Sequence, residues 1–416
     1  MDAAPPRPTR VLHAVESWRP RVSGYTVRSH ELVAAQARAA DLDPYVVVSS
    51  RQQSYGVAGA DEPDGLENRV SAVPPSARER RLRRLRRFYA DPAGLERALG
   101  VAAGRVRPDL LHGHWSSGLG MAMARAAQAA GLPFVAEVRF DLAGVVMTET
   151  VRADVGPLER ALRRRFERHL RHADAVIAAS ESLGALLRRE VPGAPEVRVV
   201  PNGVDCDAFR PGPSDPALRA GLGLEGALVV GSTSTMQRYE GLGGLIRAAE
   251  RARRHVPHLA VLLVGGGVED AELRALAAEV EVPVVFTGRV PSADVPRYLR
   301  EIDVFAVPRL DATVTRYASP LKLVEALAAG RAAVGSRVGD VPLLLGDDRG
   351  LLVPPGDEGA LAEALVALAD DGHRRALGGA ARAWAETTVT WDDTARLTRD
   401  VYRDVLRPAR TAAPAR

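Results

Sequence analysis

Short runs of β-branched and aliphatic residues alternate along the chain with longer stretches of helical periodicity. Such alternation is typical of βαβ units, in which helices connect parallel strands. The first helix is predicted at residues 29–40. In the first half of the chain the pattern predicts strands at residues 10–15, 44–49, 109–112, 133–138, 175–178 and 196–200.

The pattern restarts after Pro201. It predicts a second series of strands at residues 228–231, 259–264, 282–287, 304–307 and 332–335. Two such series indicate two doubly wound α/β domains, which we place at residues 1–198 and 199–390. Several Pro and Gly residues within 182–213 indicate that the linker between the two domains lies there. A last helix is predicted at residues 391–406, beyond the final strand, where it can pack on either domain.

Composition agrees with a globular protein and limits its partners. The 416 residues exceed what one hydrophobic core usually supports, and 46% hydrophobic with 26% charged residues excludes disorder. The 56 basic and 52 acidic side chains nearly cancel, leaving a net charge of +4. This balance argues against a nucleic-acid partner and leaves an anionic ligand or an anionic membrane surface open.

Several other classes of site find no support in the sequence. The single cysteine, Cys206, excludes an intrachain disulfide framework and suits a reducing compartment. The chain shows no signal peptide and no apolar run long enough to span a bilayer, so we expect a soluble cytoplasmic protein. His112 and His114 form only a pair, which predicts no metal site. The glycines at 265–267 do not match a dinucleotide-binding motif and predict a β-to-α turn.

The segment at 319–327, SPLKLVEAL, carries the clearest chemistry. Ser319 followed by Pro320 predicts a capped helix whose amino end favours a phosphate. Lys322 falls in its first turn and is the only lysine in the chain, so all 55 other basic residues are arginine. A compact ammonium is therefore expected to be needed there. Glu325 follows three residues later, and the alternative is a solvated Lys–Glu pair on an ordinary helix.

Three further positions lie where strands end. Gly24 lies between the first strand and first helix, where a backbone can approach a ligand or simply turn. His114 and Arg139 follow two other strand ends, and ligands of open α/β sheets bind at such ends. A structural histidine and a salt-bridged rim explain these two residues equally well. The arginine-rich segments at 78–87 and 160–171 are typical of solvated helix faces or of contact with a membrane surface.

Taken in order, the motifs of this chain resemble the retaining, nucleotide-sugar-dependent glycosyltransferases of family 4. The motifs are SGYTVRSHELV at 23–33, DLLHGHWSSG at 109–118, VRVVPNGVDCDAF at 197–209, RYEGLGGLIRAAE at 238–250, SPLKLVEALAAGRAAVGSRVGDVP at 319–342 and GLLVPPGD at 350–357. The resemblance covers nearly the whole chain. It implies the GT-B fold, α/β with two doubly wound Rossmann-like domains facing an interdomain cleft. It also implies that a terminal helix at 391–408 completes the first domain.

The resemblance assigns roles by position. It implies that His114 lies near the reacting sugar and Gly24 near the donor pyrophosphate, with Arg139 also on the donor side. Gly288 and Val290 flank the nucleotide base. Glu325 holds the ribose, while Ser319 and Leu321 present the helix end.

The chain departs from the family pattern at two places. Tyr317 occupies the first position of the family's Glu-x7-Glu pair, and the family's phosphate-binding Arg and Lys fall on Thr235 and Glu240. In this branch, with its YEGL and SPLK segments, Arg316 and Lys322 are expected to supply the missing charge, aided by Arg309 or Arg238.

The resulting hypothesis is transfer of a sugar from a UDP- or GDP-sugar with retention, without metal or cofactor. Lys322, Arg316 and the helix end would stabilise the leaving diphosphate. The acceptor is expected to be a glycan, a lipid-linked intermediate or a small molecule, with a peripheral contact at the inner face of the membrane. Two alternatives stay open at this point: a degenerate homologue that only binds a nucleotide sugar or a partner, and an epimerase of the donor.

Overall fold

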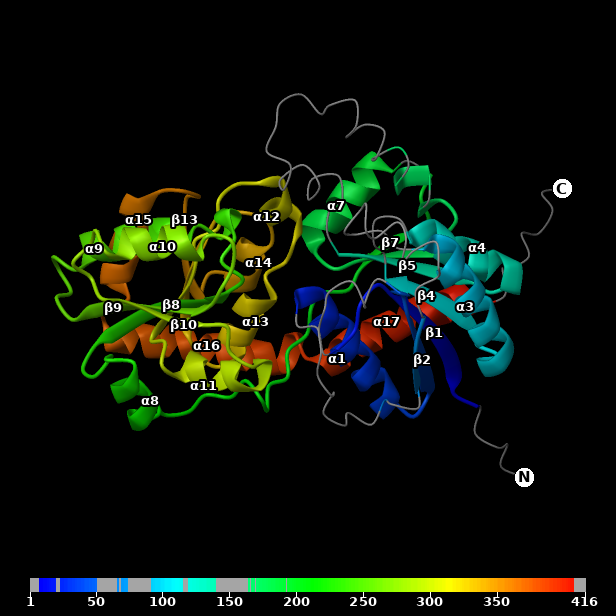
Figure 1. Ribbon diagram of the computed structural model, residues 1–416, viewed down its shortest axis with the longest axis horizontal. Helices are drawn as coiled ribbons and strands as arrows, with labels where there is room; N and C mark the ends of the chain where they lie inside the picture. The colour runs from blue at the N-terminus through cyan, green and yellow to red at the C-terminus, as the bar shows by residue number, and fades with distance from the viewer. Residues whose placement is uncertain are drawn as a thin grey trace. The chain divides into compact units, whose positions relative to one another are not determined.

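The computed structural model describes residues 7–19, 23–50, 66, 69–73, 91–114, 119–139, 164, 166–168, 170–191 and 193–407. The chain divides into two compact units, each built around its own sheet (Figure 1). The first unit consists of residues 1–201 together with 391–416, and the second of residues 202–390. The predicted basic segment at 78–87, half of that at 160–171, and the tail after 407 lie outside the described residues.

The first unit contains a seven-stranded sheet in the order β3-β2-β1-β4-β5-β6-β7. Every strand pair in it is parallel. The strands are β1 (Thr9–Val15), β2 (Leu42–Val48), β3 (Val70–Ala72), β4 (Leu110–His114), β5 (Phe134–Val138), β6 (Ala175–Ala178) and β7 (Val197–Val199). The helices are α1 (Gly24–Arg38), α3 (Pro92–Val106), α4 (Gly120–Ala130), α7 (Glu181–Glu190) and α17 (Trp391–Leu406).

The terminal helix α17 lies beside α1 on one face of this sheet (Figure 1). Its side chains Val401 and Tyr402 pack with Val11 of β1 and Ile177 of β6 in one buried cluster. The last segment of the chain therefore covers a sheet whose first strand lies almost 400 residues earlier in the sequence.

The second unit contains a six-stranded parallel sheet in the order β10-β9-β8-β11-β12-β13. Its strands are β8 (Leu228–Ser234), β9 (Leu259–Gly265), β10 (Val284–Gly288), β11 (Val304–Val307), β12 (Ala332–Ser336) and β13 (Gly350–Val353). Its helices are α8 (Pro216–Gly221), α9 (Leu242–Ala252), α10 (Asp270–Ala277), α11 (Val295–Arg300), α12 (Thr313–Tyr317), α13 (Leu321–Ala328), α14 (Val341–Leu345), α15 (Glu358–Ala367) and α16 (Asp371–Thr388), with 3-10 turns at Arg238–Glu240 and Ser292–Asp294.

Strand β9 shows why these strands are apolar throughout. Its odd-numbered residues Leu259, Val261 and Leu263 belong to the buried cluster that contains the side chains of α9 and α15. Ala260, Leu262 and Val264 point to the other face and join the cluster of α13. A parallel sheet covered by helices on both faces needs such continuous apolar runs, and this is why the sequence pattern identified the strands.

The predicted elements agree with the structure in kind and differ at some ends. The helix predicted to begin at residue 29 begins at Gly24, because Ser23 and Thr26 form a capping box. Ser319 does not cap a helix: α13 begins at Leu321, and Pro320 is its N-cap with extended backbone. The short strands β3 and β13 were not predicted. Gly265 ends β9, and Gly266 and Gly267 lie in the turn from β9 to α10, as expected.

Candidate functional site

The strand order of the second unit places a candidate site between β8 and β11. Strands β9 and β10, which follow β8 in the chain, lie along one edge of β8, whereas β11 pairs with its other edge. Ligands of doubly wound folds bind at the carboxyl ends of strands beside such a reversal. Ser234 is the last residue of β8, and Arg309 lies two residues after β11.

A buried cluster of charges occupies this point. The Nζ of Lys322 lies 2.6 Å from Oε2 of Glu240 and donates a hydrogen bond of 2.9 Å to Oγ of Ser234. Nε and Nη2 of Arg309 donate to the two carboxylate oxygens of Glu240, at 3.2 and 3.3 Å. Glu240 is 4% exposed and Arg309 7% exposed. Two cations and one carboxylate leave one positive charge, which suits an anionic ligand.

The protonation states follow from this arrangement. Burial alone raises the pKa of Glu240, but the charges of Lys322 and Arg309 lower it to about 2. Burial lowers the pKa of Lys322 below its ordinary value, and the attraction of Glu240 opposes this change. The carboxylate is therefore ionised at neutral pH, and it keeps the ammonium charged although it is buried.

The other residues predicted in this unit are placed as follows. Arg316 belongs to α12 and makes an exposed, two-pronged pair with Asp311 at 2.6 and 2.9 Å, so Arg309 and not Arg316 shares the carboxylate with Lys322. Glu325 lies on α13 close enough for its charge to raise the pKa of Lys322. The role of Glu240 was not predicted from the sequence. Glu240 stands where the family pattern has a phosphate-binding lysine, and its carboxylate pairs with Lys322 of α13, the only lysine of the chain.

Gly288 and Val290 lie at the end of β10. Gly288 has a φ of +69°, which favours glycine, and its pairing with β9 is irregular. Val290 is partly buried against the cluster that contains α13. A glycine turn followed by an apolar contact can support a flat ligand group.

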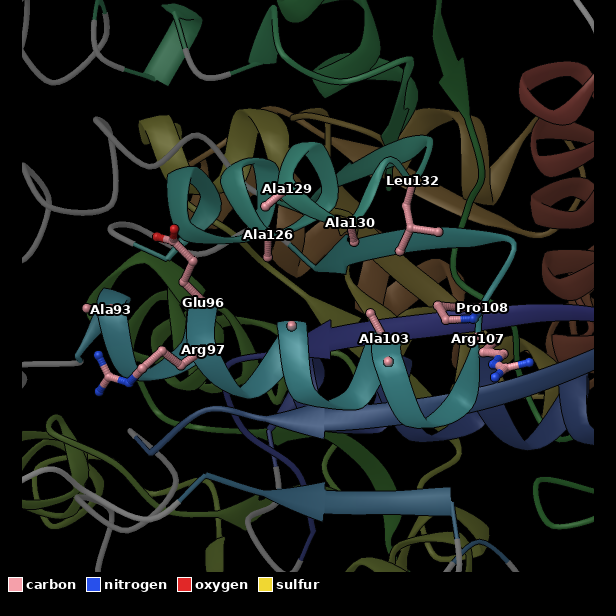
Figure 2. A pocket seen from close by; sticks show the side chains of 12 residues that line it. Ala93, Glu96, Arg97, Ala103, Arg107, Pro108, Ala126, Ala129, Ala130 and Leu132 are labelled. Atoms are coloured by element: carbon pink, nitrogen blue, oxygen red, sulfur yellow. The ribbon is translucent and has the colours of Figure 1, made fainter.

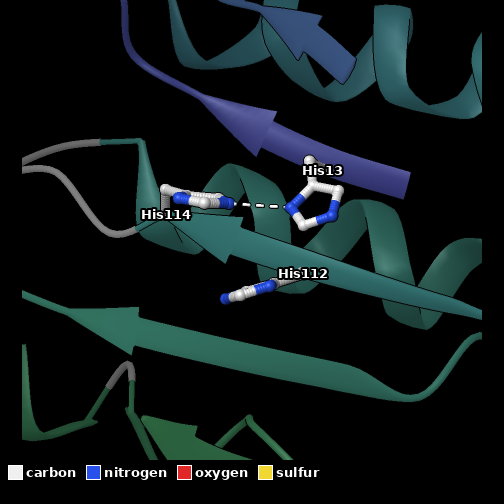
Figure 3. A group of neighbouring side chains, drawn as sticks. All are labelled: His13, His112 and His114. Atoms are coloured by element: carbon white, nitrogen blue, oxygen red, sulfur yellow. Dashed lines mark hydrogen bonds between the residues drawn. The ribbon is translucent and has the colours of Figure 1, made fainter. Parts of the chain in front are cut away.

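The first unit has a second cluster at its own strand-order reversal, between β1 and β4. Residue His13 comes from β1, and His112 and His114 come from β4 (Figure 3). All three rings are fully buried. His13 Nδ1 lies 2.8 Å from His114 Nε2, and His13 Nε2 lies 2.8 Å from Oε1 of Gln36.

Charges surround the histidines. Glu137, the fourth residue of β5, accepts hydrogen bonds from Nε of Arg28 at 3.1 Å and from Nε of Arg139 at 2.5 Å. Arg139 also donates to Nδ1 of His114, to the carbonyl of Tyr25 at 2.6 Å and to Oγ of Ser29 at 2.8 Å. The structure thus brings together His114 and Arg139, which the sequence predicted from two different strand ends.

Burial decides the charge of these groups. It lowers the pKa of His13 to about 4, and it lowers the pKa values of His112 and His114 well below their ordinary value. For Glu137, burial raises the pKa, but Arg139 and Arg28 hold it well below its ordinary value. At neutral pH the cluster therefore contains neutral histidines, one carboxylate and two guanidinium groups.

Three histidines with nitrogens within 4.8 Å of one another raise the question of a metal site. Sequence spacing predicted only a pair, because it cannot show that β1 and β4 are neighbours. The geometry opposes a metal: the rings of His112 and His114 are stacked at 4.5 Å and 24°, so their in-plane lone pairs do not converge on one ion. Arg139 also occupies Nδ1 of His114. We treat the trio as a hydrogen-bonded network.

Gly24 is the first residue of α1 and not a loop glycine. A Cβ built at this position meets nothing within 4 Å, so the surrounding side chains do not require glycine. Glycine at the amino end of a helix leaves the backbone N–H groups accessible to an anion. The approach of a ligand to Gly24 stays a prediction.

A hollow of about 690 Å³ lies elsewhere in the first unit, between α3 and α4 (Figure 2). Small side chains such as Ala103, Ala126 and Ala129 line it. Pro108 and Leu132 mark its end beside the amino ends of β4 and β5, opposite the carboxyl ends where the histidines lie. None of the predicted site residues lines this hollow.

None of the helices in the described ranges is long and apolar enough to cross a membrane.

Comparison with known proteins identifies relatives over both units. Residues 22–208 match the profile described as "Glycosyltransferase Family 4", and residues 227–371 match that described as "Glycosyl transferases group 1". A D-inositol 3-phosphate glycosyltransferase of Saccharomonospora viridis is 32% identical over 321 residues, which are 73% of this chain and 72% of the relative. A GDP-mannose-dependent alpha-(1-6)-phosphatidylinositol monomannoside mannosyltransferase of Mycolicibacterium smegmatis is 35% identical over 199 residues, 46% of this chain. The chain spans about half the length of that relative, 52%.

Solved structures share the fold. A sucrose-phosphate synthase from Thermosynechococcus elongatus matches 95% of this chain and 99% of its own, with a TM-score of 0.73 and 21% identity. The Anabaena protein HepE in complex with UDP-glucose matches 95% of this chain and 99% of its own, with a TM-score of 0.70 and 20% identity. At such identities the likeness concerns the fold, two Rossmann-like units with parallel sheets, as in the GT-B glycosyltransferases.

Proposed function

This chain belongs to glycosyltransferase family 4, and we propose that it transfers a sugar from a nucleoside-diphosphate sugar to a hydroxyl acceptor with retention of anomeric configuration. The observation that carries this proposal is the buried cluster of Arg309, Glu240 and Lys322 at the strand-order reversal of the second unit. Its single excess positive charge is available to the diphosphate of the donor. The helix α13 begins beside Lys322 and adds the positive end of its dipole.

The difficult step in such a transfer is the departure of the diphosphate. Negative charge develops on the bridging oxygen while the sugar becomes oxocarbenium-like. A cation that is already fixed before the reaction stabilises this charge without reorganisation. Lys322 meets this condition, because Glu240 and Ser234 hold its ammonium in place. The leaving phosphate then takes the proton of the acceptor hydroxyl on the same face of the sugar, which gives retention without a carboxylate nucleophile.

The donor and acceptor are proposed from the relatives. Those at 32–35% identity include enzymes named for GDP-mannose, for phosphatidylinositol mannosides and for D-inositol 3-phosphate. We therefore propose a GDP- or UDP-sugar as donor and a lipid-linked or polyol acceptor used in building a cell-surface glycan. The reaction would take place in the cytoplasm, and a lipid-linked acceptor would bring the enzyme to the inner face of the membrane. In the donor site we place Glu325, Ser319, Leu321, Gly288 and Val290 from the second unit, and Gly24, Arg139 and His114 from the first.

The test is release of nucleoside diphosphate from GDP-mannose, UDP-glucose, UDP-N-acetylglucosamine and ADP-glucose, without added metal. Each donor is offered alone and with D-inositol 3-phosphate or phosphatidylinositol monomannoside. Replacing the ammonium, in Lys322→Ala, is expected to lower the rate by about 10²–10³-fold. Arg247→Ala, which removes an exposed pair with Glu358, is the matched control and should keep the wild-type rate.

Each other outcome has a definite meaning. Full activity in Lys322→Ala excludes the proposed phosphate site. An altered free sugar nucleotide, without release of diphosphate, indicates an epimerase. If a donor binds in calorimetry but is not turned over with any of the acceptors, the chain is a binding protein. Replacing Arg316 by Ala in the same assay tests whether this exposed residue acts directly, because its pair with Asp311 predicts only a small effect.

A further inference from the structure

The hydrogen bonds around the three buried histidines have a direction that can be worked out from Gln36. An amide has a fixed donor and a fixed acceptor. Oε1 of Gln36 accepts from Nε2 of His13 at 2.8 Å, so that nitrogen carries the proton. The amide Nε2 of Gln36 donates to the hydroxyl of Tyr402 at 3.1 Å.

From His13 the direction continues to Arg139. A neutral ring protonated on Nε2 has a bare Nδ1, and this atom lies 2.8 Å from Nε2 of His114. His114 must therefore donate from Nε2, which leaves its own Nδ1 as an acceptor. Arg139 donates to that atom, and a guanidinium has no acceptor. Starting from Arg139, which can only donate, the series again ends with a proton on Nε2 of His13 and therefore with Oε1 of Gln36 as its acceptor.

The other branch runs through the terminal helix. The hydroxyl of Tyr402 accepts from Gln36 and so donates its own proton to Nδ1 of His112, 2.6 Å away. Burial raises the pKa of Tyr402 well above its ordinary value, so the hydroxyl keeps this proton. The proton of His112 is then on Nε2, which lies 3.6 Å from Oε2 of Glu137.

We propose that Gln36 and Tyr402 are positioning residues that fix all three histidines in the Nε2–H tautomer. Their effect is to keep Nδ1 of His114 an acceptor for Arg139, and so to hold that guanidinium at the end of β5. With the opposite tautomer, an N–H of His114 would face an N–H of Arg139, and a buried donor would lose its partner. The step from a fixed Arg139 to catalysis rests on the proposed function, whereas the tautomers do not.

The proposal gives the terminal helix a role beyond covering the sheet. Tyr402 lies 366 residues from Gln36 and 290 from His112, yet its single hydroxyl satisfies both. Neither residue is hydrogen-bonded to Arg139 within the described ranges, and neither stands among the predicted site residues. Their influence passes through two imidazole rings.

The test is long-range proton–nitrogen NMR of the full chain with 15N-labelled histidine at pH 7. The exposed His255 and His258 of the second unit provide internal references for averaged tautomers. His13, His112 and His114 are expected to show only Nε2–H signals with slowly exchanging protons. An Nδ1–H tautomer on His13 or His114 in the unaltered protein overturns the proposal, so no variant is needed to contradict it.

Two variants then test the positioning residues. Tyr402→Phe removes the donor to His112 and is expected to shift its Nδ1 resonance and to admit its second tautomer. Gln36→Leu is expected to admit both tautomers of His13 and His114. Tyr298→Phe in the second unit is the matched control and should leave all three histidines unchanged. Signals that stay unaltered in both folded variants would falsify the assignment.

Activity separates positioning from a purely structural role. With the donor identified above, Gln36→Leu is expected to lower kcat about tenfold and to change KM for the donor less than about twofold. This split is expected because the variant leaves unchanged the residues of the second unit that we propose for the nucleotide, Glu325, Gly288 and Val290. Altered tautomers with an unchanged kcat would overturn the link to catalysis. If no donor is turned over at all, the NMR result still decides the tautomers.

Discussion

Each unit contains a buried charge cluster near the strand-order reversal of its sheet, with the carboxylate on β5 in the first unit and in the turn after β8 in the second. In the first, Glu137 lies between Arg28 and Arg139; in the second, Glu240 lies between Arg309 and Lys322. Each cluster is a buried carboxylate between two cations, beside the strands where the chain order reverses. Each leaves one positive charge.

The clusters differ in what they leave available. Arg28 and Arg139 use carbonyls, the hydroxyl of Ser29, a histidine and Glu137, so their guanidinium groups are tied to the surrounding backbone. Lys322 has three N–H bonds and, within the described ranges, two partners, Glu240 and Ser234. We propose that the same charge balance serves two purposes: the first cluster fixes a local geometry, and the second offers a cation to a ligand.

The largest effect on stability is expected when the cluster of Arg28, Glu137 and Arg139 is broken. Glu137→Gln leaves Arg28 and Arg139 buried without their carboxylate, which should cost about 3–5 kcal/mol of stability in the first unit. Hydrogen exchange followed by mass spectrometry reports each unit separately, as a molecule with two units requires. The matched control is Glu196→Gln, whose pair with Arg198 is exposed and should contribute little. Equal protection in both variants would show that Glu137 is not essential to the fold.

The two units are expected to lose stability in different ranges of acidic pH. His13 has its pKa lowered from 6.5 to about 4, so between these values the unfolded chain binds a proton that the folded chain does not. Stability of the first unit therefore falls as the pH drops from about 6.5 to 4, by about 3 kcal/mol for this residue alone. His112 and His114 change in the same direction.

In the second unit the corresponding group is Glu240, with its pKa lowered from 4.5 to about 2. Its contribution is complete above pH 4.5 and is lost only as the pH falls toward 2. Hydrogen exchange corrected for intrinsic rates, measured at pH 7, 5.5 and 4.5, should show the first unit losing protection before the second. The opposite order would contradict the assigned protonation states.

Glu240→Gln is expected to have a smaller effect, lowering the stability of the second unit and raising its affinity for GDP or UDP. Loss of the carboxylate raises the charge of the cluster from one to two and weakens the hold on Lys322, at a cost of about 1–3 kcal/mol in the second unit. The added charge should tighten binding of GDP or UDP about tenfold at low salt, and less at high salt. Calorimetry at two salt concentrations measures this. Weaker binding would mean that the position of Lys322 matters more than the net charge.

The sequence predicted the class of the fold and much of its layout. Strands buried on both faces have continuous apolar runs, so 11 strands could be placed from their pattern, and the terminal helix was predicted at Trp391–Leu406, where it is found. Helix ends were less predictable. Ser23 caps α1 through a side-chain bond that the apolar period does not reveal, and Pro320 remained outside α13 because its backbone is extended.

The candidate site was predicted in its chemistry but not in its pairings. The unusual composition, one lysine among 55 arginines, singled out Lys322 from the sequence by itself. Only the tertiary structure decided that Glu240 and Arg309 surround it, that His13 joins His114, and that Tyr402 closes the network from the far end of the chain. The physical reason is that hydrophobic periodicity records which face of an element is buried, whereas these contacts depend on which strands become neighbours. That order is fixed by the packing of the whole sheet and leaves no local trace in the sequence.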